Sequence, residues 1–185
     1  MNLGPWIKTA RSRFYFDPGQ VLIIIEDIAH ALSNICRFNG HSRVFYSVAQ
    51  HSVLMAEYIS IGYKNAALLH DAHEAYIGDV SSPLKSLLPD YQSIEQKIQR
   101  NVLQVFGLDS VPQAVKDLDK QMLITEMLAL DLWDDALDMD LYNRLDIEIH
   151  PWIPEKAEKE FLYYYEQLFN RKEKDEKEDG PDRRV

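Results

Sequence analysis

Apolar residues recur at helical spacing along most of the chain, and this pattern predicts a series of helices. The expected helices cover residues 26–35, 47–59, 64–77, 90–106, a segment after Pro112, and residues 154–169. Asn39-Gly40, Gly62 and Gly107 supply stops between them. Several of these ranges pair an apolar stripe with a polar one, as in helices that pack on one side. We therefore expect an all-α fold, a helical bundle.

The first 25 residues do not follow helical spacing. Aromatic residues and turn formers mix across residues 14–19, and an apolar run follows at residues 21–25. This composition predicts an irregular arm or a short strand pair. A second short strand is expected at residues 43–47, which contain Val44 and Tyr46. The bundle is thus expected to carry a minor short-strand element near its N-terminus.

The length of 185 residues suits one domain with a core large enough to need no disulfide. We expect this domain at residues 1–170, followed by a flexible tail at residues 171–185 with six basic and six acidic side chains. No apolar run is long enough to cross a bilayer, and the first residues lack a signal-peptide segment. The single cysteine, Cys36, cannot form an internal disulfide. These features favour a cytoplasmic protein without a membrane partner.

The net charge of -10 is unevenly distributed. Between Asp117 and Glu148 there are ten acidic residues and two basic ones. Binding to a nucleic-acid backbone depends on clustered Lys and Arg, so polymeric DNA or RNA is disfavoured as a partner. A small anion can still bind where a few basic side chains converge in a pocket.

Four groups that bind metals or move protons lie close together near the middle of the chain. The apolar residues 66–69 indicate a buried helix, which then reaches His70 and Asp71. Glu74 lies four residues beyond His70, so both are expected on one helix face. Asp79 follows shortly afterwards. A buried His-Asp pair without a role is costly, which favours a functional site here.

His51 and Asp119 extend this group to two imidazoles and two carboxylates on three predicted helices. Such a mixed set, with His70 and Asp71, suits a divalent transition metal that keeps open coordination positions. A helical bundle can bring the four side chains together. Nitrogen and oxygen ligands admit Zn, Co, Mn or Fe.

The order of these residues resembles that of the HD-domain metal-dependent phosphohydrolases. The resemblance rests on Gln50-His51-Ser52, residues 68–75 (LLHDAHEA), Gly78-Asp79, residues 82–85 (SPLK) and Asp119-Lys120. It covers residues 20–170 and is nearest to small members that act on deoxynucleotides. These include bacterial 5'-deoxynucleotidases and phage dATP triphosphohydrolases of the DatZ type.

The resemblance implies a role for each residue of the group. His51, His70, Asp71 and Asp119 match the metal ligands, Glu74 matches the catalytic carboxylate, and Asp79 matches an acidic position near the attacking water and sugar. No histidine occurs between His73 and His150, whereas two-metal relatives need more. One metal per chain is therefore expected. Relatives form dimers or hexamers, which implies a homo-oligomer.

Phosphate groups need cationic partners, and Arg37 and Lys85 are the candidates. Arg37-Phe38 resembles an Arg-Trp pair that some relatives use at the sugar and phosphate. Phe38 in place of Trp leaves strict deoxyribose selection open, and a core aromatic is an equally good interpretation of this residue. Lys116 is a further candidate cation for a triphosphate.

The resemblance favours a dNTP triphosphohydrolase, with dATP preferred, that releases deoxynucleoside and triphosphate. A 5'-deoxynucleotidase acting on dNMPs is the alternative within the same class. An HD-type di-iron oxygenase is disfavoured by the histidine count, and an inactive metal-binding regulatory module is disfavoured because all four ligands and Glu74 are present.

Overall fold

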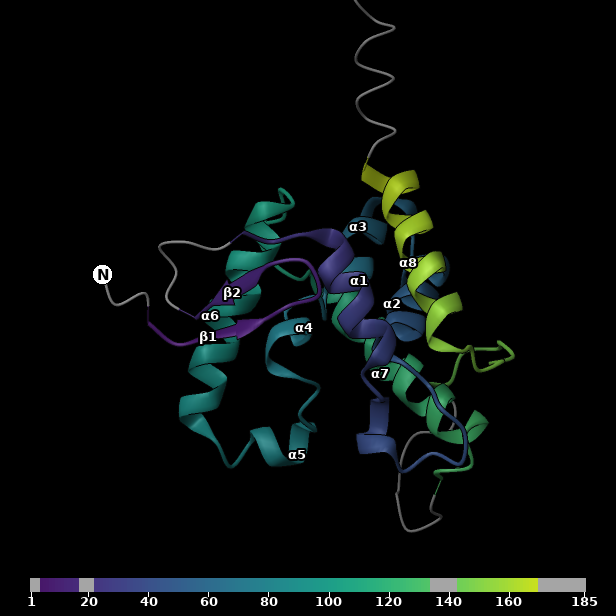
Figure 1. Cartoon of the computed structure of the whole chain (residues 1–185). Coiled ribbons are helices and arrows are strands. Elements are labelled where there is room, and N and C mark those ends of the chain that lie inside the picture. The colour runs from purple at the N-terminus through teal and green to yellow at the C-terminus, as the bar shows by residue number, and fades with distance from the viewer. Residues whose placement is uncertain (1–3, 17–21, 134–142, 170–185) are drawn as a thin grey trace, which may run out of the picture.

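The computed structural model describes residues 4–16, 22–133 and 143–169. Its strands are β1 (Trp6–Lys8) and β2 (Arg13–Tyr15), and its first helices are α1 (Ile25–Asn34), α2 (Val48–Tyr58), α3 (Lys64–Leu69) and α4 (Glu74–Ile77). The chain continues through α5 (Ser82–Lys85), α6 (Pro89–Val105), α7 (Gln113–Ala129) and α8 (Pro154–Phe169). Short 3-10 turns lie at Arg37–Gly40 and Ile61–Tyr63. The predicted all-α class with a small strand pair is confirmed (Figure 1).

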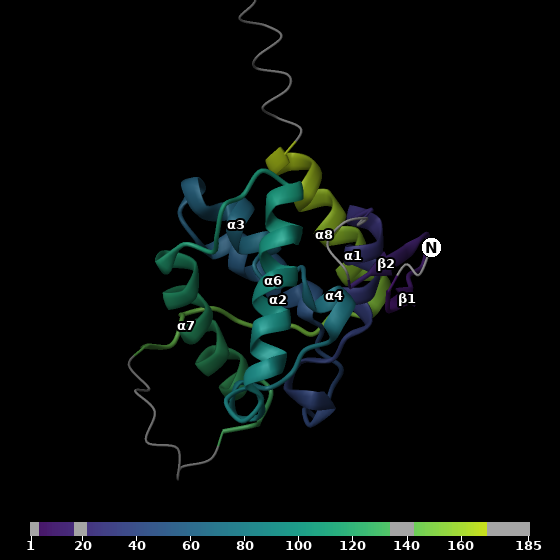
Figure 2. The same ribbon diagram turned by 90° about the vertical axis from the view of Figure 1, so that its left-hand side faces the viewer.

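Helix α2 is the buried centre of the bundle. Every residue from Val48 to Ala56 is buried, and α2 contacts α1, α3, α7 and α8. A helix enclosed on all sides has no free face for its polar residues, so Gln50, His51 and Ser52 must find partners inside the protein. Figure 2 shows α6 crossing in front of α2, between α7 and α4.

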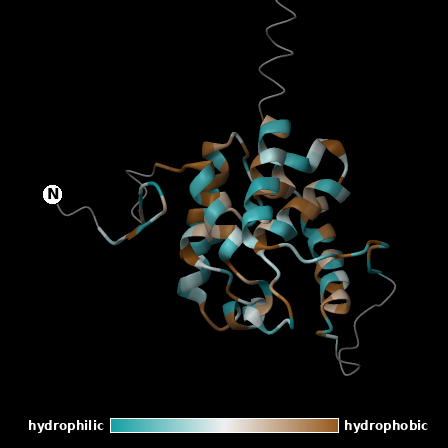
Figure 3. Ribbon diagram, turned by 45° about the vertical axis from the view of Figure 1, so that its right-hand side comes forward, coloured by the Kyte–Doolittle hydropathy of each residue, from teal (hydrophilic) through white to brown (hydrophobic). Residues whose placement is uncertain are grey.

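The outer helices show the expected division between a buried and an exposed face. Hydrophilic and hydrophobic bands alternate along their ribbons (Figure 3). In α8, Ala157 and Phe161 are fully buried at a spacing of four residues, while Glu155 and Lys159 are exposed. This spacing places both apolar residues on one side of the helix, against α1 and α2.

The predicted second strand at residues 43–47 is wrong. Only an isolated bridge joins Cys36 to Ser47. The partner segment leaves the extended conformation immediately, because Phe38 and Asn39 have positive φ angles of 55° and 52°. Without a second extended segment beside it, a strand has no ladder to form.

The predicted continuous helix at residues 64–77 is also wrong. In the structure this segment forms two helices, α3 and α4, which are separated by a turn that begins at His70. The N–H of Glu74 donates to the carbonyl of Asp71 at 2.9 Å, a tighter bond than the α-helical one to His70. The His70 carbonyl instead accepts a hydrogen bond from Nε2 of Gln99 at 3.2 Å. Helix α6 therefore supports the break.

Strands β1 and β2 form an antiparallel hairpin that is attached to the bundle through Asp27 of α1. The Asp27 carboxylate accepts hydrogen bonds from Thr9 Oγ1 at 2.6 Å, the Arg11 N–H at 2.7 Å and Ser12 Oγ at 3.0 Å. Burial raises the pKa of Asp27, but these hydrogen bonds outweigh burial and hold the pKa below its ordinary value. Asp27 thus joins the hairpin to α1 as a carboxylate.

Replacing Asp27 with asparagine is expected to lower the free energy of unfolding by about 2 kcal/mol at pH 7, because hydrogen bonds to a charged acceptor are lost. Folding lowers this pKa, so the stabilisation is present above about 3.9, the unfolded value, and is lost as the pH falls toward the folded value. Thermal unfolding of both proteins should show a difference that narrows below pH 4. A difference independent of pH contradicts this role.

Within residues 4–16, 22–133 and 143–169, no helix combines the length and apolar character that a membrane crossing requires. The charged segment at residues 171–185, for which a flexible tail is expected, lies outside the described residues.

Candidate functional site

Three parts of the bundle bring the expected ligands together. His51 comes from the first turn of α2, His70 and Asp71 from the turn between α3 and α4, and Asp119 from α7. Both imidazoles are buried, with exposed fractions of 0% and 4%, whereas the Asp119 side chain is 41% exposed. The cluster is therefore anchored in the core on the histidine side and open on the Asp119 side.

His51, His70 and Asp119 offer ligand atoms that all lie within 4.8 Å of one another, whereas Asp71 falls outside that group but lies close to both histidines. His51 Nε2 lies 3.3 Å from His70 Nε2, 3.2 Å from Asp119 Oδ1 and 3.7 Å from Asp71 Oδ2. His70 Nε2 lies 3.0 Å from Asp71 Oδ2. Tetrahedral zinc with bonds of about 2.0–2.1 Å places its ligand atoms about 3.3–3.4 Å apart. The separations in the cluster, from 3.0 to 3.7 Å, lie on both sides of that value.

The outer nitrogens of both rings are held by acceptors. His51 Nδ1 lies 2.6 Å from Glu126 Oε1, and His70 Nδ1 lies 2.7 Å from the carbonyl of Ala67. A carbonyl oxygen accepts only, so His70 Nδ1 carries the proton, and the same assignment for His51 follows from the Glu126 carboxylate. A ring protonated at Nδ1 can present its Nε2 lone pair to a cation. Burial and Arg37 lower the pKa of His51, but Glu126 and Asp119 outweigh them and raise the pKa to about 9. The site therefore favours positive charge at Nε2, which a proton supplies in the metal-free protein and a metal ion can replace.

The electrostatics of the cluster also favour a cation. Burial raises the pKa of Asp71, but His70, His51 and Arg37 outweigh burial and hold the pKa well below its ordinary value. Burial likewise raises the pKa of Asp119, but the hydrogen bond with His51 and the charges of His51 and His70 together outweigh burial and hold the pKa below its ordinary value. Both carboxyl groups therefore remain ionised beside the imidazoles.

Glu74 and Asp79 lie next to the ligands without joining them. Glu74 is only 4% exposed, and its Oε2 has no hydrogen-bond partner. Burial raises the pKa of Glu74, and the charges of Asp71 and Asp79 raise it further. Burial and Asp71 also raise the pKa of Asp79, although Arg37 opposes them. Gly78, with a φ of 80°, ends α4 between the two residues.

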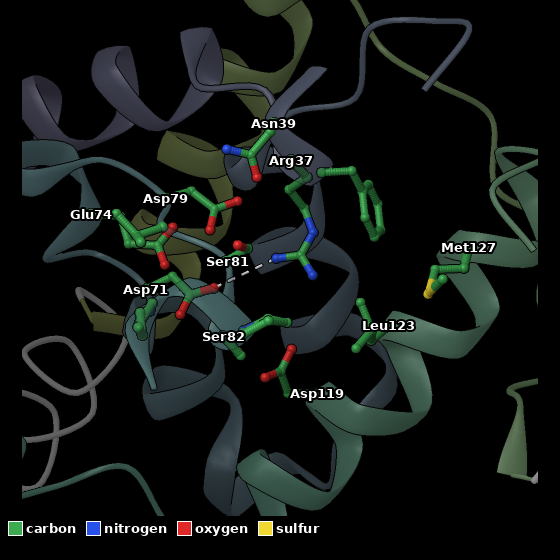
Figure 4. Close-up of a pocket in the computed structure, with 14 residues that line it drawn as sticks. Arg37, Asn39, Asp71, Glu74, Asp79, Ser81, Ser82, Asp119, Leu123 and Met127 are labelled. Carbon is green, nitrogen blue, oxygen red and sulfur yellow. Dashed lines mark ion pairs between the residues drawn. The ribbon is translucent and has the colours of Figure 1, made fainter. Parts of the chain in front are cut away.

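A cavity of about 380 Å³ adjoins the ligand cluster. Its lining includes the acidic residues Asp71, Glu74, Asp79 and Asp119, and the polar residues Asn39, Ser81 and Ser82. Figure 4 shows Leu123 and Met127 on the side opposite Glu74, with Arg37 between them. The cavity therefore has one apolar side and one charged side, which suits a ligand with both kinds of surface.

The expected substrate-binding residues also line this cavity. Arg37 is buried, not solvated, and its guanidinium carbon lies 5.5 Å from the centre of the Phe38 ring. The positive φ of Phe38 is uncommon for a bulky residue, and such conformations concentrate at functional sites. Lys85 is half-buried, with Nζ 2.6 Å from Glu95 Oε1. Lys116, the additional candidate, is exposed and does not line the cavity.

Sequence reasoning missed Glu126, which is fully buried behind the ligands. It lies seven residues beyond Asp119, two helical turns along α7, and so on the same side of that helix. A signal was present in the sequence, because Glu126 follows the buried residues Met122 and Thr125 of the α7 stripe. A carboxylate at the edge of an apolar stripe needs a partner inside the protein.

No family model matches the chain. The uncharacterized protein YfdR of Escherichia coli is 47% identical over 132 residues, which make up 70% of this chain and 74% of YfdR. An uncharacterized protein of Rhodobacter capsulatus is 39% identical over 111 residues, which make up 54% of this chain and 57% of that protein. Given its identity with YfdR over most of both sequences, the chain belongs to the same family as YfdR.

Proposed function

We propose that this protein is a metal-dependent phosphohydrolase of deoxynucleotides, with one divalent transition metal per chain. The observation that carries the proposal is the pair of Nε2 atoms 3.3 Å apart, flanked by two carboxylates, at the edge of a cavity that also contains Glu74. Within the described residues, His51, His70 and Asp119 are the one cluster with metal-ligand geometry, which supports a single ion.

His51, His70, Asp71 and Asp119 would hold the metal. The chemistry that a bound divalent ion supplies is a more acidic water, with a pKa of about 7, and polarisation of a phosphoryl oxygen. We assign acceptance of the proton from the attacking water to Glu74, because Glu74 lines the cavity and its buried Oε2 has no hydrogen-bond partner among the residues that the structure describes. Asp79, which lines the same cavity, assists Glu74 in this proton transfer.

The cavity walls would place the rest of the substrate. Arg37 and Lys85 pair with phosphate oxygens. Phe38, Leu123 and Met127 provide an apolar surface for the nucleobase. No covalent intermediate with the protein is required.

The substrate is a dNTP, preferably dATP, by resemblance, and a dNMP is the second candidate. One observation favours the monophosphate. The two basic side chains that line the cavity are each already near a carboxylate, Arg37 beside Glu126 and Lys85 beside Glu95. A triphosphate carries more negative charge into this acidic cavity than a monophosphate does.

The test is product analysis with purified protein that has been loaded with metal. Each dNTP and dNMP is incubated with Mn²⁺, Co²⁺ or Zn²⁺, and phosphate, diphosphate and triphosphate are separated by ion chromatography. Triphosphate release identifies the triphosphohydrolase, and phosphate release from dNMPs identifies the nucleotidase. The matching ribonucleotides report on sugar selection beside Phe38. No release from any nucleotide, with metal bound at full occupancy, rejects the proposal.

A further inference from the structure

Glu126 is in contact with both the ligand cluster and the phosphate-binding arginine. Its Oε1 accepts a hydrogen bond from the Tyr46 hydroxyl at 2.8 Å and lies 2.6 Å from His51 Nδ1. Its Oε2 lies 3.0 Å from Nε of Arg37, an ion pair whose N–H is not aligned for a hydrogen bond. The fully buried Glu126 carboxylate of α7 therefore contacts α2 through His51. It also contacts the segment at residues 37–46 through Arg37 and Tyr46.

Glu126 adds a third carboxylate to Asp71 and Asp119 around Arg37. Opposite these three carboxylates, a divalent ion with Arg37 provides three positive charges. Arg37 stays a cation, because burial lowers its pKa but Glu126, Asp71 and Asp119 together raise the pKa above its ordinary value. Without Glu126, the buried guanidinium would keep only Asp71 as an ion-pair partner among the described residues, and Asp71, whose Oδ2 lies 3.8 Å from Arg37, also faces the proposed metal position.

We propose that Glu126 is a positioning residue that acts on both binding functions of the site. Through His51 it orients the ring and keeps Nε2 directed at the metal position, and through Arg37 it holds the guanidinium at the cavity wall. Hydrogen bonds from ligating histidines to carboxylates commonly have this orienting effect on metal binding. The part that concerns Arg37 rests on the proposed phosphohydrolase function, whereas the part that concerns His51 does not.

A purely structural role is the alternative, since a buried carboxylate with several partners also stabilises helix packing. The two roles differ in what a neutral replacement changes. Loss of packing lowers stability without changing the metal affinity of the folded protein. Loss of positioning lowers metal affinity in protein that remains folded.

The experiment compares Glu126→Gln with Asp27→Asn. Asp27 is a matched control, because it is also a buried, hydrogen-bonded carboxylate but lies at the hairpin, outside the cavity. Metal is removed with a chelator, and Zn²⁺ or Mn²⁺ affinity is measured by calorimetry. We expect affinity about 10- to 100-fold weaker in Glu126→Gln and unchanged in Asp27→Asn. Wild-type affinity in Glu126→Gln, or an equal loss in both variants, overturns the proposal.

The part of the proposal that concerns Arg37 is tested by steady-state kinetics at a saturating metal concentration. We expect Glu126→Gln to raise KM for the nucleotide more than it lowers kcat, since ground-state binding by Arg37 is disturbed. An unchanged KM overturns the claim that Glu126 positions Arg37. If all variants and wild type lack turnover, the proposed function fails, but the calorimetric result still decides the role of Glu126 toward His51.

A double variant covers the case in which Glu126→Gln does not fold. Arg37→Gln with Glu126→Gln removes both charges of the pair, so no unpaired guanidinium remains buried. Its metal affinity is compared with that of Arg37→Gln alone. Weaker binding in the double variant supports the proposal, and equal binding overturns it.

Discussion

Replacing Glu74 with glutamine is expected to lower nucleotide turnover by about 10²- to 10⁴-fold while metal content stays at the wild-type level. Glu74 lines the cavity but is not part of the metal-ligand cluster. Its buried Oε2 has no hydrogen-bond partner in the protein, so it is available to a molecule in the cavity. Glutamine has the same size but cannot accept a proton at neutral pH.

Turnover, nucleotide affinity and metal content are measured on the same preparation of this variant. Nucleotide affinity should change little, because the proton transfer occurs in the transition state. Glu57→Gln is the control, since Glu57 is exposed at the end of α2 and does not line the cavity. Turnover within a few-fold of wild type, with normal metal content, would falsify the catalytic role of Glu74 and transfer the proton role to Asp79.

Replacing Asp119 with alanine is expected to abolish turnover by releasing the metal. Asp119 is the ligand with the most exposed side chain, at 41%. The buried His51 loses it as a partner but keeps Glu126 at Nδ1 and Asp71 near Nε2, so the fold should survive. Alanine variants of His51, His70 and Asp71 should also lose metal. In these variants the effect on stability should be larger, since their side chains are more buried.

Elemental analysis gives the metal content of Asp119→Ala, and circular dichroism checks that it remains helical. Asp117→Ala is the matched control, because Asp117 is an exposed carboxylate two residues earlier on α7 and accepts from Gln113 Nε2. We expect the control to keep both metal and turnover. Full metal occupancy in Asp119→Ala removes this residue from the ligand set.

Elements whose limits depend on local signals were predictable. Helix α8 spans Pro154–Phe169, the predicted range, because Pro154 suits a first turn and the apolar spacing continues from there. Helix α2 begins after Ser47, whose side chain accepts a hydrogen bond from the N–H of Gln50 at 3.1 Å. These signals lie within a few residues of the ends that they determine.

Elements that depend on distant partners were not predictable. Helical spacing continues through His70, and nothing local indicates that its carbonyl will bond Gln99 of α6. The strand at residues 43–47 failed because the segment opposite, at Arg37–Gly40, adopts a 3-10 turn. In both cases a second segment decided the backbone of the first.

The sequence by itself determined the helix class and the residue types of the site, because hydrophobic spacing specifies which face of each helix is buried. It also identified His51, His70, Asp71 and Asp119 as a candidate ligand set from their order. Only the tertiary structure decided that the Nε2 atoms of the histidines face each other and that Arg37 is buried. Glu126 illustrates the reason: it lies 75 residues from His51 in the chain and 2.6 Å from it in space, a relation set by how α2 and α7 pack and not by any local pattern.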